Sequence, residues 1–111
     1  MSTTKTYKKG GSYRCAILAA ADNDTFTVPA GFKIKDIVTK KIGTVAGNLT
    51  IGTSDSDDSI VGTVALGTDD GAIAIHTLLL SVFSTTAEQT CYINISSATT
   101  CDMYITMQRI N

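Results

Sequence analysis

Residues 26–37, FTVPAGFKIKDI, place the only proline of the chain two positions before a glycine, between two runs of strand-forming residues. Pro29 has no N–H to donate to a sheet, so it must end a strand or lie on a sheet edge. Gly31 permits the backbone conformation of a tight reversal. We therefore expect a short strand over 25–28, a turn, and a long strand over 33–41.

Within the long strand, alternate residues are predicted to face opposite sides of the sheet. Phe32, Ile34 and Val38 are predicted to share the core face, while the lysines between them face solvent. Ile37 interrupts this alternation. The interruption predicts a β-bulge or a second packed face.

The rest of the chain follows the same pattern of short β-rich runs between clusters of Gly, Asp, Asn and Ser. No stretch keeps the apolar spacing of an amphipathic helix. We predict an all-β fold, an antiparallel two-sheet β-sandwich of about eight strands that is jelly-roll-like. An extended basic arm, residues 1–12, is expected to precede the sandwich domain, residues 13–111. The predicted strands are 13–19, 25–28, 33–41, 47–51, 59–66, 72–83, 89–96 and 102–110.

Composition narrows the possibilities further. The chain has 111 residues, 43% of them hydrophobic and 6% aromatic, with no Trp, which fits one domain with an aliphatic core. It lacks an apolar run long enough to span a membrane and a pattern typical of a cleaved signal peptide, so neither is expected. The odd number of cysteines, without C-x-x-C spacing, predicts free, reduced thiols. They are Cys15, Cys91 and Cys101.

Charge is segregated along the chain. Residues 1–41 carry eight Lys or Arg against three Asp, whereas residues 42–111 carry one Arg against six Asp and one Glu. One interpretation is simple solvation of an arm and of strand faces. The other is that the acid-free arm, mobile in isolation, docks on an acidic surface. Its few basic residues and lack of an aromatic platform argue against nucleic acid. The candidate attachment residues are Lys5, Lys8, Lys9 and Arg14.

Two acidic segments resemble each other: LTIGTSDSDDS (49–59) and VALGTDDGA (64–72) each run from a strand into Gly-Thr and then acids. They are predicted to be turns at the same end of the sandwich. Clustered carboxylates suit calcium, but the spacing does not match an EF-hand loop. We therefore expect solvated turns, with no metal and no cofactor.

The longest apolar run, AIAIHTLLLSVF (72–83), is apolar on both faces if it is a strand. Ile73, Ile75 and Leu79 share one face, and one of the two faces must be covered by something outside the core. The face that carries the sole histidine is predicted to contact a neighbouring subunit, in a homo-oligomer and most simply a cyclic trimer. A catalytic partner for this histidine is not identifiable. The predicted interface residues are Ala74, His76, Leu78, Leu80 and Val82.

Several of these segments together resemble a known class of protein. FTVPAGFKIKDIV, AGNLTIGTSDSDDSIV, QTCYINISS and CDMYITMQRI are similar to segments of the small β-sandwich proteins that decorate tailed-phage virions, as capsid-decoration, head-fibre or tail-associated proteins. The resemblance covers roughly residues 25–110. It implies a non-enzymatic structural role in the virion, a symmetric oligomer, and attachment through an N-terminal segment to major capsid or other virion proteins.

The alternative is a carbohydrate- or receptor-binding module that recognises a host surface glycan. Sugar sites usually present aromatic platforms, and this chain has no Trp and only scattered tyrosines. That favours the structural role. An enzyme is not expected, because one His and three dispersed Cys do not assemble a nucleophile, a base and an orienting group.

Overall fold

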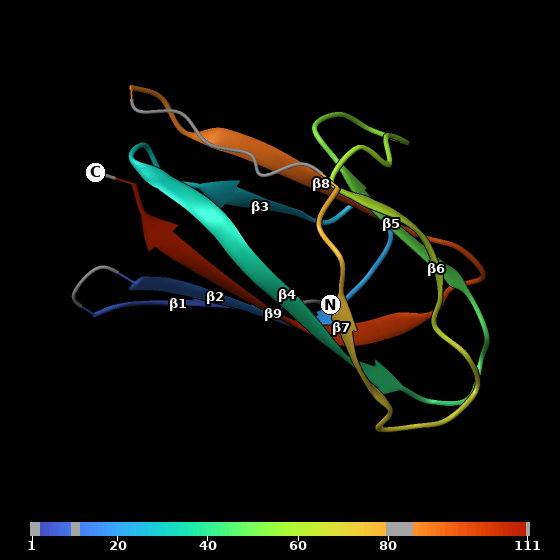
Figure 1. The fold of residues 1–111 in the computed structure, drawn as a ribbon. Helices are drawn as coiled ribbons and strands as arrows, with labels where there is room; N and C mark the ends of the chain where they lie inside the picture. The colour runs from blue at the N-terminus through green and yellow to red at the C-terminus, as the bar shows by residue number, and fades with distance from the viewer. Residues whose placement is uncertain (1–2, 10–11, 80–85, 111) are drawn as a thin grey trace.

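The structure, a computed structural model, describes residues 3–9, 12–79 and 86–110. Within these residues the chain forms nine strands in two sheets that pack face to face (Figure 1). The five-stranded sheet has the order β1-β2-β9-β4-β7, the four-stranded sheet has the order β3-β8-β5-β6, and neighbours are antiparallel. The strands are β1 (Thr3–Lys9), β2 (Ser12–Ala20), β3 (Thr25–Val28), β4 (Phe32–Ile42), β5 (Asn48–Gly52), β6 (Val61–Ala65), β7 (Ile73–His76), β8 (Gln89–Ile95) and β9 (Thr100–Arg109).

From β2 onward the chain passes back and forth between the two sheets, and only β5 and β6 are consecutive in the same sheet. This path sets β2, β9, β4 and β7 against β3, β8, β5 and β6. The predicted antiparallel, jelly-roll-like sandwich is confirmed, and its eight expected strands correspond to β2 through β9.

The proline corner forms as predicted. β3 ends at Val28, directly before Pro29, and the backbone N–H of Phe32 donates to the Pro29 carbonyl at 3.1 Å. Gly31 has a φ of 82°, which a residue with a side chain rarely adopts. The chain therefore reverses within three residues and enters β4 at Phe32.

The bulge in β4 is also confirmed. The register between β4 and β9 shifts between Ile34 and Asp36, so one extra residue enters β4. Beyond the shift the alternation is displaced by one position: Ile37 is fully buried, and Val38 turns to the outer face, where it is half-buried. The prediction that Val38 shares the core face with Phe32 was therefore wrong.

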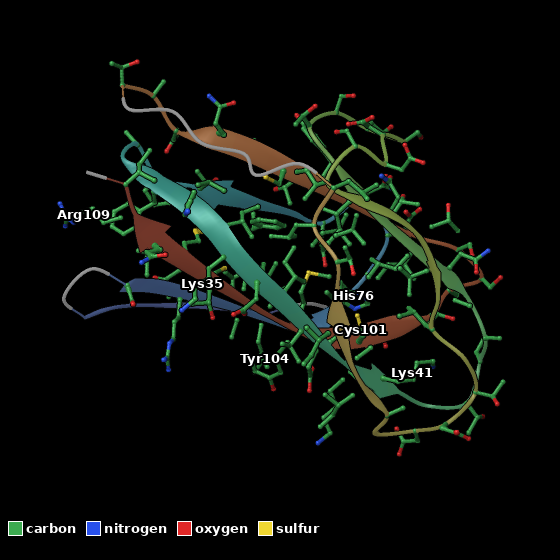
Figure 2. All side chains as sticks on the ribbon, viewed as in Figure 1. Lys35, Lys41, His76, Cys101, Tyr104 and Arg109 are labelled. Carbon is green, nitrogen blue, oxygen red and sulfur yellow. The ribbon has the colours of Figure 1, made fainter. Side chains whose placement is uncertain are left out.

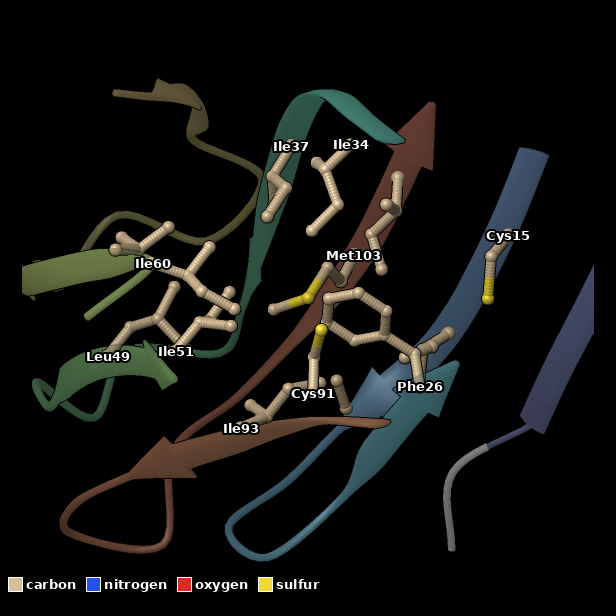
Figure 3. Close-up of a cluster of buried hydrophobic side chains, with 14 of the residues drawn as sticks. Cys15, Phe26, Ile34, Ile37, Leu49, Ile51, Ile60, Cys91, Ile93 and Met103 are labelled. Atoms are coloured by element: carbon tan, nitrogen blue, oxygen red, sulfur yellow. The ribbon is translucent and has the colours of Figure 1, made fainter. Parts of the chain in front are cut away.

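The core lies between the sheets and is mainly aliphatic (Figure 3). Ile34, Ile37 and Met103 of one sheet meet Leu49 and Ile51 of the other. Each of these side chains is at most 2% exposed, so burial of apolar surface is the main stabilising contribution.

The three cysteines are free and buried, as expected. Burial raises the pKa of Cys91 to about 12 and that of Cys101 to about 11, and it also raises the pKa of Cys15. All three thiols are therefore protonated at neutral pH and act as small core hydrophobes, since the thiolate is the reactive form.

Two sequence predictions about strands need correction. Residues 3–9 of the predicted arm form β1, which pairs with β2 from Thr3 opposite Leu18 to Lys9 opposite Ser12. This part of the arm is an edge strand, and its almost entirely polar sequence, TTKTYKK, suits an edge that faces water.

The strand predicted over 72–83 is much shorter in the structure. β7 ends at His76, and the N–H of Leu79 already donates to the carbonyl of Ile60 at 2.8 Å, beside the other sheet. Residues 80–83 lie outside the described part of the chain.

Candidate functional site on the five-stranded sheet

The segregation of charge along the sequence becomes a segregation between the two sheets. The strands of the five-stranded sheet contain all nine Lys and Arg residues of the chain and only two acids, Asp36 and Asp102. The strands of the four-stranded sheet contain no charged residue. The other eight acids lie in the segments between strands. One sheet is therefore strongly basic, and the other is neutral with an acidic rim.

An apolar row crosses the outer face of the basic sheet. Ile75 of β7 is paired with Val38 of β4, Val38 with Tyr104 of β9, and Tyr104 with Ala16 of β2. Directly paired residues share a face, so these side chains lie next to one another. Ile75 is 78% exposed and Tyr104 is 42% exposed. Ile73, the next outward residue of β7, is 71% exposed and lies opposite Lys40.

Basic side chains border this row. Lys40 and Lys35 of β4 are exposed, and so is Arg14 of β2, which lies opposite Thr106. In Figure 2, Lys35 and Tyr104 project away from the four-stranded sheet. Exposed apolar side chains rimmed by charged ones are typical of protein interaction surfaces.

The predicted attachment residues gather at one edge of this sheet. Lys5 lies opposite Ala16, Lys8 opposite Tyr13 and Lys9 opposite Ser12 in the β1–β2 pairing. Their backbone positions, together with exposed Arg14, make a basic edge at the opposite end of the strand order from β7. Four strand spacings separate the two edges, about 19 Å.

The predicted interface residues lie on the other face of β7. His76 is buried, Ala74 and Leu78 are half-buried, and Leu78 packs against the core. The large apolar residues left exposed here are Ile73, Ile75 and Leu79, so the apolar face open to another chain is the opposite one from that predicted. The reason is that β7 is the sheet's edge strand and turns its even-numbered residues toward the opposite sheet. Leu80 and Val82 lie outside the described residues.

His76 has a structural environment. Its Nε2 forms a buried hydrogen bond with the hydroxyl of Thr39 at 2.7 Å. Burial lowers the pKa of His76, so the ring is neutral at neutral pH. This contact joins the edge strand to β4 beneath the outer face.

Lys41 is buried, although a lysine is expected to face solvent. Its side chain is 3% exposed, and Nζ donates to the carbonyl oxygens of Ile42 at 2.7 Å and Gly43 at 3.2 Å. The β4 bulge explains its position, because it turns Ile37, Thr39 and Lys41 inward. The bulge was predicted, so this consequence was available from the sequence.

The two acidic segments do not lie at the same end of the sandwich, contrary to prediction. They follow β5 and β6, which are antiparallel, so their C-terminal ends point in opposite directions (Figure 1). Asp57 accepts hydrogen bonds from the Ser59 hydroxyl and the Thr53 N–H, which lower its pKa, and Asp70 accepts from the Gly43 N–H at 2.7 Å. Both aspartates thus fasten turns. Among the described residues, no three His, Cys, Asp or Glu converge as a metal site.

Comparison with known proteins places the fold. No protein-family model matches the chain, and no curated protein gives a significant match. A chain in the acid-stable capsid structure of Helicobacter pylori bacteriophage KHP30 is similar, with a TM-score of 0.62, 11% identity, and coverage of 97% of this chain and 93% of that one. A chain in the capsid asymmetric unit of cyanophage Pam1 gives a TM-score of 0.55, 12% identity, and coverage of 98% and 86%.

At these identities the likeness establishes a shared fold. This β-sandwich, over nearly its whole length, occurs in phage capsid structures. In the part of the chain that the structure describes, no helix is both long and apolar enough to cross a membrane.

Proposed function

We propose that this chain is a non-enzymatic structural component of a phage virion, attached as a decoration protein to an acidic surface of the particle. The observation that carries the proposal is the basic, partly apolar outer face of the five-stranded sheet. The near-complete coverage of two chains in phage capsid structures supports it. We therefore propose that this chain, too, is part of a phage capsid.

The basic edge is the proposed attachment surface. Lys5, Lys8, Lys9 and Arg14 lie on two paired strands, so their backbone positions are held close together at one sheet edge. Complementary charge steers association over a Debye length of about 8 Å at physiological salt. The partner is therefore an acidic patch on the major capsid protein or on another virion protein.

The opposite edge is the proposed contact between copies. β7 has one neighbour, β4, and exposes Ile73 and Ile75 beside it, with Leu79 close in sequence and 66% exposed. An exposed apolar edge strand is a site for pairing with another chain unless something covers it. A second copy in a closed ring, most simply a trimer, would cover it.

Two variants separate these assignments. Ile75→Lys places a charge in the proposed contact between copies, and sedimentation equilibrium should show a change from three times 11.7 kDa to 11.7 kDa. The side chain is 78% exposed, so the fold should persist. Lys8→Gln/Lys9→Gln/Arg14→Gln should remain oligomeric but no longer cosediment with virions stripped of this protein.

The matched control changes the same amount of charge on the other side of the sandwich. Ala65→Glu/Thr68→Glu/Thr90→Glu also lowers the net charge by three units, by adding a carboxylate at each of three exposed positions. It should bind stripped virions like the unmodified chain. Equal binding by the basic-edge variant, or absence of the protein from purified virions, would refute the proposal.

A further inference from the structure

A shallow cavity of about 430 Å³, widely open to solvent, lies on the outer face of the four-stranded sheet, on the opposite side of the sandwich from the five-stranded sheet. Its floor is made by Asn48 and Thr50 of β5, Thr63 of β6 and Asn94 of β8. Thr50 is paired with Asn94, so their side chains lie side by side. The floor is therefore a patch of hydroxyl and amide groups on a rigid sheet.

One wall is the loop after β5, which folds back over the sheet. This is possible because Gly52 has no side chain: a Cβ there would lie 2.5 Å from the carbonyl carbon of Asp57. With its side-chain amide turned so that both ends are satisfied, Asn94 ties the wall to the floor: its nitrogen donates to Asp55 Oδ1 at 3.1 Å and its oxygen accepts from the Ser56 N–H at 3.2 Å. Floor and wall are thus fastened together.

The opposite wall is held equally well. Asp22 Oδ1 accepts from the Ile95 N–H at 3.0 Å, and the Asn23 N–H donates to the Ile93 carbonyl at 2.9 Å. The Ser96 hydroxyl oxygen accepts from the Asn48 N–H at 2.9 Å. Each wall therefore contacts β8 or β5 through its own hydrogen bonds, and the cavity is formed before any ligand enters.

The lining has a distinctive chemistry. Nine of its ten residues are polar, and none is Lys or Arg. Hydroxyl and amide groups both donate and accept hydrogen bonds, whereas the two carboxylates accept only. Such a mixture matches neighbouring hydroxyls of a sugar, and the carboxylates disfavour an anionic one. The lining residues are Asp22, Asn23, Asn48, Thr50, Asp55, Ser56, Thr63, Asn94, Ile95 and Ser96.

The strand that carries Asn94 also presents an aromatic residue on the same face, outside the ten lining residues. Tyr92 precedes Asn94 by two positions on β8 and therefore shares its face. It is half-buried, and its partners are Gly52 and Thr25, which are small. An aromatic side chain of this kind offers an apolar surface to the C–H groups of a sugar ring.

We propose that this cavity binds a short neutral oligosaccharide, with Thr50, Thr63 and Asn94 contacting its hydroxyls and Tyr92 contacting a ring face. The volume lies within the range of small-molecule sites, about 300–1,000 Å³. Because the cavity and the proposed attachment surface are on opposite sheets, each proposal can fail while the other stands. On a virion, such a site would face outward when the basic sheet faces the particle.

The test is a titration of the full chain, labelled with nitrogen-15, against maltotetraose, cellotetraose and chitotetraose. At least one of these probes should shift amide signals around Thr50, Thr63 and Asn94 and leave β2 unchanged. Thr50→Val/Thr63→Val should weaken that binding at least tenfold. Thr106→Val, a matched loss of a hydroxyl on the other sheet, should leave it unchanged.

Two further results bear on the chemistry. Sialyllactose, which is anionic, should bind more weakly than lactose, because Asp22 and Asp55 line the cavity. No shift with any of the three tetrasaccharides at 10 mM would overturn the proposal. Shifts of the same amides with calcium chloride alone would also overturn it, since they would identify a cation site.

Discussion

Gly52→Ala tests how the loop after β5 is held against the sheet. The new Cβ would overlap the carbonyl oxygen and a side-chain oxygen of Asp57 and lie 2.5 Å from its carbonyl carbon, where ordinary contact begins at 3.4 Å. The main chain at Asp57 must therefore retreat by about 0.9 Å, the difference between these two distances. A flexible side chain cannot absorb this overlap by turning away.

The cost follows from the overlap. If the loop stays in place, overpacking of this kind costs about 1–3 kcal/mol. If the loop moves, it loses the hydrogen bonds of Asp57 with Thr53 and Ser59. A cost of about 2 kcal/mol corresponds, for a domain of this size, to a fall in Tm of about 8 °C.

Urea unfolding followed by far-ultraviolet circular dichroism measures this change. The control is Gly62→Ala on the neighbouring strand, where an added Cβ would meet only the end of the Leu79 side chain at 3.3 Å. That variant should lie within about 0.5 kcal/mol of the unmodified chain, a typical limit for substitutions without a specific clash. A Gly52→Ala protein as stable as Gly62→Ala would refute the close approach of the loop.

Three further predictions concern two titrating groups and the core. Burial lowers the pKa of His76 below 6.5, so at acidic pH the unfolded chain binds a proton that the folded chain does not. The free energy of unfolding should therefore fall as the pH drops below about 6.5, by up to about 1.4 kcal/mol per pH unit. Urea melts between pH 7.5 and 5 measure this change. His76→Gln should lose this slope, and an unchanged slope would assign it to another group. Hydrogen bonds from Ser59 and Thr53 lower the pKa of Asp57 below 3.8, so the stabilisation present above pH 3.8 is lost as the pH falls through the folded-state value. A carboxyl titration by NMR with a midpoint at or above 3.8 would contradict this. Cys91→Ser should cost about 1–3 kcal/mol in urea melts, because Cys91 is fully buried and a hydroxyl there is desolvated; a loss below 0.5 kcal/mol would show that the hydroxyl finds a partner.

Local chemistry accounts for what the sequence predicted correctly. Pro29 and Gly31 set the end of β3 and the start of β4. Proline narrows the range of backbone angles at its own position, and glycine widens it to include the positive φ seen at Gly31. The bulge near Ile37 was visible as a break in alternation. β1 was missed because a polar edge strand lacks the alternating apolar residues that mark a strand in the sequence. It is held by backbone pairing with β2, which leaves no such pattern.

Candidate surfaces were harder to predict, because period-two alternation defines two faces without showing which one is covered. For β7, only the sheet pairing shows that His76 faces the opposite sheet while Ile75 faces outward. The cavity beside Asn94 was not predicted at all. It joins residues from β5, β6, β8 and two loops, and no single segment carries its pattern.

The sequence by itself determined an all-β sandwich, its turns, its free cysteines and a charge imbalance along the chain, because these follow from each residue's own backbone preference, polarity or ionisation. The tertiary structure alone decided where those charges lie. Sheet order gathers every Lys and Arg into five strands and leaves the other four uncharged, although the two sets of strands alternate along the chain. Hydrogen-bond pairing between distant strands makes that selection, and it turns a linear imbalance into one basic sheet and one sheet of uncharged strands.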